Sequence, residues 1–179
     1  MGKPPVSDRS EAISAIARAL MPPPPGETEK AELYRQAGRA VVELSNAENL
    51  LAVIFCILSV PVPVEDAKKM FSSQGGFEKR LYLVNFMVVR ANHVGEMEIW
   101  GKIFKELNTH RGVRNLIAHQ RVIMEMSADS PVVDVSLTPL FYTRRGKRVS
   151  TAEIKSTADE LESINKRLWE FVESLGKPD

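Results

Sequence analysis

The stretch "VRNLIAHQ", residues 113–120, brings Arg114, Asn115 and His119 together within six residues. An arginine guanidinium stays charged at any physiological pH and can hold two oxygens of one phosphate. A histidine with an unperturbed pKa of ~6.5 can accept or donate a proton near neutrality. Asn115 can orient the imidazole or donate to the phosphate. We therefore take these three residues as the candidate site, and their chemistry requires no metal ion and no cofactor.

The motif stands at the end of a predicted amphipathic helix. Arg111, Asn115 and His119 follow one another at four-residue steps, so they share one face of that helix, with Arg114 on its flank. On an ideal helix Arg114 and His119 are roughly 140° apart. They can share one phosphate only if the helix unwinds near its end, or if a second copy completes the site. Glycine inside a helix costs about 1 kcal/mol relative to alanine, so we expect a partner helix or a phosphate to approach closely at Gly112.

Basic residues gather around the motif although the net charge of the chain is only +1. Five basic residues and one glutamate lie within 102–121, and "RRGKR" at 144–148 adds a further +4. Such clusters suit an anion site, and we expect Arg111 and Arg121 to contact phosphate. Simpler explanations stay open, because charge runs are commonly solvated surface. The helix dipole also favours cations in a last turn by ~0.3–1 kcal/mol each, which accounts for His119 and Arg121 without a function.

The composition is that of a globular protein with one domain. Its 179 residues are 44% hydrophobic and 26% charged. One cysteine, Cys56, cannot form an internal disulfide, which fits a reducing compartment. The most apolar run, "LLAVIFCILSV", is about half as long as a membrane-spanning helix, and the N-terminus lacks the pattern of a secretion signal. We therefore expect a cytoplasmic protein that does not enter a membrane.

Hydrophobic periodicity predicts a mainly α fold. Residues 1–26 read as an N-terminal arm with a short helix and a Pro-rich linker, and residues 27–179 as one helical domain. Helical periods cover residues 28–58, 64–71, 77–93, 96–119 and 150–175. Between 121 and 149 the period becomes two, which predicts a β-hairpin or meander. Ser150 and Glu153 then form a capping box that starts the last helix. The expected fold is a bundle of about five helices with a small β-hairpin inserted after the motif helix.

The motif resembles the signature of the HEPN superfamily, in which an arginine, a polar residue, three further residues and a histidine lie on the helix that closes a bundle. "RNLIAH" matches this signature with Arg114, Asn115 and His119. The resemblance implies a metal-independent endoribonuclease, often a toxin or antiviral effector, whose motif helices meet across a two-fold dimer. It implies that His119 is the general acid and base, Arg114 the phosphate clamp and Asn115 the orienting group. Arg111 and Arg121 would contact the RNA backbone.

Two other functions stay open. Some HEPN proteins are non-catalytic and bind nucleotides, a nucleotidyltransferase or another subunit, and the same residues would then hold an anion without cleaving it. The chain can also be a helical dimerisation protein whose basic residues are ordinary surface. Together with the ribonuclease interpretation, these alternatives predict as partners RNA, a second copy of the chain, and an antitoxin or a nucleotidyltransferase.

Three further polar residues are assigned to ordinary surface. His93 and His110 have no companions at metal-ligand spacing, so we expect them at the surface or as helix caps. Glu48 lies in "VELSNAENLL", where it could support the site from a neighbouring helix, although a solvated helix face is the simpler prediction.

Overall fold

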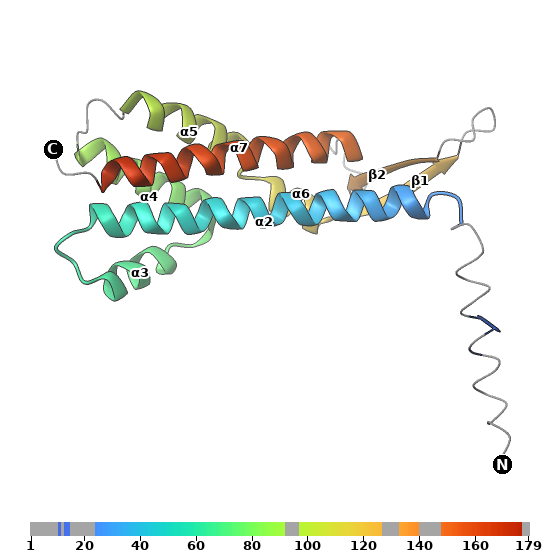
Figure 1. The fold of residues 1–179 in the computed structure, drawn as a ribbon, viewed down its shortest axis with the longest axis horizontal. Helices are drawn as coiled ribbons and strands as arrows, with labels where there is room; N and C mark the ends of the chain where they lie inside the picture. The colour runs from blue at the N-terminus through green and yellow to red at the C-terminus, as the bar shows by residue number, and fades with distance from the viewer. Residues whose placement is uncertain are drawn as a thin grey trace, which may run out of the picture.

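The computed structural model describes residues 24–91, 97–126, 133–139 and 148–176, together with residues 11, 13 and 14. It is mainly helical, with a small antiparallel sheet (Figure 1), which confirms the predicted fold class. The elements are α2 (Glu27–Leu58), α3 (Val64–Ser73), α4 (Gly76–Ala91), α5 (Met97–His110), α6 (Val113–Ala118), β1 (Gln120–Met126), β2 (Val133–Pro139), β3 (Val149–Ser150) and α7 (Thr151–Leu175). Most of the predicted arm and most of the basic run at 144–148 lie outside the described residues.

The two longest helices, α2 and α7, lie side by side and run in the same direction (Figure 1). Arg39 of α2 forms 2.5 Å ion pairs with Asp159 and Glu162 of α7. One turn further along both helices, the Asn165 amide donates to the Glu43 carbonyl at 2.9 Å and to its carboxylate at 2.8 Å. The pair therefore stays in register, and it forms the frame on which the other elements pack.

The apolar period of α2 places its large side chains inside the molecule. The helix has acidic residues in its first turn, where the dipole favours them. It ends at Leu58, shortly before Pro61 and Pro63, which cannot continue a helix. By length and composition alone α2 could cross a membrane. Its buried residues, such as Leu33, Leu44 and Leu51, pack against other parts of the chain, and 28% of its most apolar 18-residue window is buried inside the molecule.

Helices α4 and α5 form a hairpin that completes the bundle. The Trp100 indole of α5 donates to the Asn85 amide oxygen of α4 at 2.9 Å, and the rings of Trp100 and Phe171 of α7 are 5.3 Å apart. The main core is buried between α2, α4, α5 and α7. It includes Leu44, Leu51, Ile54, Leu81, Val84, Trp100, Ile103, Leu107, Leu161, Leu168 and Phe171.

The inserted β segment is a three-stranded meander with the order β1-β2-β3. The inward face of β2 is buried against the first turns of α2 and α7, where it forms a second core with Leu33, Ala37, Ile154 and Ala158, among others. On the opposite face Arg148 donates to Ser136 at 2.6 Å, to Asp134 at 2.7 Å and to Glu125 at 2.8 Å. Its hydrogen bond to Glu125 raises the pKa of Arg148. The last residue of "RRGKR" therefore holds the sheet together.

Candidate functional site

The predicted single helix over 96–119 is wrong, because the chain forms two helices there. Helix α5 ends at His110, and α6 starts at Val113 after a turn at Arg111 and Gly112. Poor helix propensity at Gly112 lowers the cost of leaving the helix. Arg111 therefore does not share a helix face with Asn115. A Cβ at Gly112 would also meet nothing within 4 Å, so no described part of the chain makes the predicted close approach there.

Helix α6 is short and is held in place by its apolar side. Val113 and Ile117 pack against the second core beneath α2, which leaves Arg114 and Asn115 exposed on the other side. The helix ends just before His119, whose backbone N–H donates to the Asn115 carbonyl at 3.1 Å. This bond keeps the helical pattern up to His119, so the unwinding that would bring His119 to Arg114 is not present. His119 is exposed, and β1 begins directly after it.

The arginines around the motif differ in whether their charge is already compensated. Arg111 donates to Glu78 of α4 at 2.5 Å and to the Asn108 side chain at 3.2 Å. Within the described part of the chain, the side chains of Arg114, His119 and Arg121 make no hydrogen bond or ion pair. These three are therefore available to an external anion, whereas Arg111 first has to leave Glu78.

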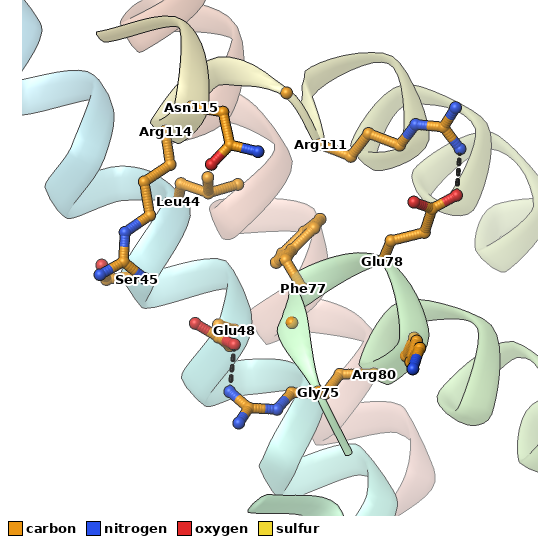
Figure 2. Close-up of a pocket in the computed structure, with 13 residues that line it drawn as sticks. Leu44, Ser45, Glu48, Gly75, Phe77, Glu78, Arg80, Arg111, Arg114 and Asn115 are labelled. Atoms are coloured by element: carbon orange, nitrogen blue, oxygen red, sulfur yellow. Dashed lines mark hydrogen bonds and ion pairs between the residues drawn. The ribbon is translucent and has the colours of Figure 1, made fainter. Parts of the chain in front are cut away.

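Arg114 and Asn115 border a hollow of about 610 Å³ between α2, the start of α4, and α6 (Figure 2). Leu44 and Phe77 lie between the charged groups, and the Arg114 guanidinium extends toward Ser45 of α2 (Figure 2). The lining residues are Leu44, Ser45, Glu48, Gly75, Gly76, Phe77, Glu78, Lys79, Arg80, Arg111, Gly112, Arg114 and Asn115.

The hollow has a positive charge in excess. Four basic side chains and two carboxylates line it. Both carboxylates are engaged, because Glu48 pairs with Arg80 and Glu78 pairs with Arg111 (Figure 2). The charges of Lys79 and Arg114 remain uncompensated within the described residues. This arrangement favours an anion beside Arg114.

The structure brings only part of the predicted site into this hollow. Arg111, Arg114 and Asn115 line it, whereas His119 and Arg121 do not. The cause is local geometry: α6 stops at Ala118, so His119 lies beyond its last turn, and Arg121 belongs to an exposed position of β1. The candidate site thus has two parts, the hollow at the start of α6 and His119 at its end.

Several lining residues were not predicted from the sequence. Phe77, Lys79 and Arg80 follow the Gly75-Gly76 break, and only this break before the basic "FEKR" signals them. The prediction of a solvated Glu48 is wrong, because its side chain is largely covered and pairs with Arg80. Its position one turn after Leu44 on α2 places it in the wall of the hollow.

His110 is also placed differently from the prediction. It is 9% exposed, and its Nε2 lies 3.1 Å from a carboxylate oxygen of Glu160 on α7. One turn earlier Glu106 forms a two-pronged ion pair with Arg167 of α7. That hydrogen bond from Arg167 lowers the pKa of Glu106. These contacts join α5 to α7, so the role of His110 is to hold these two helices together. His93 lies outside the described residues.

Among the described residues, no group of three or more His, Cys, Asp or Glu side chains is placed to hold a metal ion. No family model, no curated protein sequence and no solved structure matches this chain. A proposal of function therefore has to rest on the residues and their geometry.

Proposed function

We propose that the protein is a HEPN-like, metal-independent endoribonuclease, possessing a site of Arg114, Asn115 and His119. One observation carries the proposal. All three side chains are exposed on or directly after α6, and those of Arg114 and His119 have no partner within the described part of the chain. Most other arginines described are tied to carboxylates, as Arg39, Arg111 and Arg148 are. An unpaired arginine on α6 and an unpaired histidine directly after it are the residue types that bind and cleave a phosphodiester.

The reaction would be transesterification within the RNA backbone. His119 takes the proton of a 2′-hydroxyl, whose oxygen then attacks the adjacent phosphorus. Arg114 holds the non-bridging oxygens and stabilises the charge that builds up on them. The 5′-oxygen leaves with a proton, which leaves a 2′,3′-cyclic phosphate on one product and a 5′-hydroxyl on the other. In a dimer, the same histidine of a second copy supplies that proton.

A second candidate function is the non-catalytic binding of a nucleotide or another phosphate compound. The observation that favours it is the position of His119 outside the hollow that Arg114 and Asn115 line. Binding would then depend on Arg114, and His119 would be dispensable. The two functions therefore make opposite predictions for the replacement of His119: the ribonuclease loses its activity, whereas the binding protein keeps its affinity.

The test compares wild-type protein, His119→Ala and Arg114→Ala in cleavage of end-labelled RNA in the presence of EDTA. A ribonuclease loses its activity in both variants, because base and phosphate clamp are each required. The matched control is Arg90→Ala, which removes an exposed arginine of α4 that also has no partner within the described residues. The control is expected to cleave like wild type. RNA that stays intact with wild type, but binds it and not Arg114→Ala, would support the binding function instead.

A further inference from the structure

The hollow beside Arg114 combines an aromatic ring with uncompensated positive charge. Phe77 and Leu44 lie in its middle, between the Arg80–Glu48 pair and the Arg111–Glu78 pair (Figure 2). Its volume of about 610 Å³ lies within the range of small-molecule sites, roughly 300–1,000 Å³. We propose that it binds one nucleotide of single-stranded RNA, with the base stacked on Phe77 and a phosphate held by Arg114. This assignment rests on the proposed function. It places the bound nucleotide beside Arg114, the residue proposed to hold the phosphate that is cleaved.

The chemistry of the lining distinguishes a nucleotide from a simple anion. A phosphate alone needs the cations but has no use for an apolar floor, whereas a base has two apolar faces and polar edges. Phe77 is half-buried, so its ring is held in place while part of it remains open to the hollow. Asn115 and Ser45 border the same space and present groups that pair with base edges or sugar hydroxyls. Aromatic stacking together with a nearby arginine is the usual means of holding single strands.

The ligand is a single strand and not a duplex. In an RNA helix the bases stack on one another and cannot reach a ring inside a hollow. An unpaired nucleotide can turn its base onto Phe77 while its backbone continues past Arg114 along α6. Since His119 follows the last turn of α6, the strand would run from the hollow toward the residue proposed to cleave it.

The test uses a fluorescein-labelled 12-nucleotide single strand with 2′-O-methyl sugars, which cannot be cleaved by its own 2′-oxygen. Fluorescence anisotropy measures its dissociation constant for the full chain. Phe77→Leu keeps an apolar side chain but removes the stacking surface, so we expect about tenfold weaker binding. The matched control is Phe86→Leu, because Phe86 is an exposed phenylalanine of the same helix outside the hollow. This control is expected to bind like wild type.

Two variants at exposed positions test the phosphate half without disturbing the core. Arg114→Gln is expected to reduce the slope of log Kd against log salt by about 0.7, because one phosphate contact on a single strand is lost. Ser45→Asp adds a carboxylate to the lining of the hollow that Arg114 also borders, and it is expected to weaken binding about tenfold by offsetting the positive charge there. The same 12-mer in a duplex is expected to bind at least tenfold more weakly than the single strand.

Equal affinities for Phe77→Leu and Phe86→Leu would overturn the stacking assignment, and so would equal affinities for the single strand and the duplex. An unchanged salt slope in Arg114→Gln would overturn the assignment of phosphate to Arg114. The proposed function is tested separately with unmodified RNA. Cleavage that depends on His119 but not on Phe77 would support the proposed ribonuclease and contradict this nucleotide subsite. Binding that depends on Phe77, without any cleavage of unmodified RNA, would support the subsite and contradict the proposed ribonuclease.

Discussion

Arg111 and Arg114 lie three positions apart and border the same hollow, but only Arg111 is paired with a carboxylate. We expect Arg114→Ala to abolish RNA cleavage and leave the melting temperature unchanged, because no described contact is lost. Arg111→Ala removes the half-exposed pair with Glu78, which stabilises by ~0.2–1 kcal/mol, and is expected to keep most of the activity. Thermal unfolding and cleavage rates of both variants check this. Full activity of Arg114→Ala would contradict the assignment.

The ion pair of Glu106 with Arg167 makes part of the stability depend on pH. Its hydrogen bond lowers the pKa of Glu106 in the folded chain below the usual 4.5. A depressed carboxyl pKa stabilises the fold above the unfolded pKa, and this contribution is lost as the pH falls through the folded value. Glu106→Gln should therefore lower the unfolding free energy at pH 7, by ~0.2–1 kcal/mol for so exposed a pair. Urea unfolding at pH 7 and below pH 4 measures the gap, which should shrink at the lower pH.

Among the elements, the breaks before α4 and α6 are both made at glycines, for different reasons. Gly76 has a φ of +80°, a conformation that costs a residue with a side chain roughly 1–2 kcal/mol. Gly112 has a φ of −88° and open space around a Cβ. We expect Gly76→Ala to lower the unfolding free energy by ~1–2 kcal/mol. Gly112→Ala should change it by less than ~0.5 kcal/mol, because lower unfolded-state entropy offsets the poorer N-cap.

Denaturant unfolding of the two alanine variants separates these cases. A large loss of stability in Gly112→Ala alone would mean that a neighbouring segment does pack against that position, as the sequence first indicated. Equal losses in both would contradict the conformational difference between the two glycines.

Most elements could be predicted from the sequence because their signals are local. The capping box of Ser150 and Glu153 is present in the structure, and the change of period after His119 marks the sheet. The break at Arg111 and Gly112 was missed because Val113 and Ile117 continue the helical spacing across it. Helix α5 ends there beside Gly112, a weak helix former. Arg111 pairs with Glu78 of α4, and local spacing in the sequence does not reveal that contact.

At the scale of the whole molecule, the site depends on contacts between distant segments. The hollow is assembled from residues 44–48 of α2, 75–80 at the start of α4, and 111–115. No periodicity or motif links these three segments, so Arg114 was found from its type and spacing. Phe77 was not found, and Glu48 was weighed as a support of the site but assigned to solvated surface. The burial of His110 was missed for the same reason, since its partner Glu160 is 50 positions away on α7.

The two-part site leads us to expect a dimer. His119 does not line the hollow that contains Arg114, and the proposed mechanism takes the acid from the same histidine of a second copy, so it predicts a dimer. Sedimentation equilibrium is expected to give twice the 20.0 kDa of the chain at the concentrations that cleave RNA. A mass of one chain under conditions of full activity would contradict this arrangement.

The most direct measurement is the cleavage of end-labelled RNA by wild-type protein and His119→Ala, prepared identically and assayed in EDTA. We predict that wild type alone produces fragments ending in 2′,3′-cyclic phosphates, because the 2′-oxygen attacks while His119 moves the proton. Equal cleavage by both proteins would contradict the role of His119. No cleavage by either, across several single-stranded RNAs, would contradict the proposed ribonuclease.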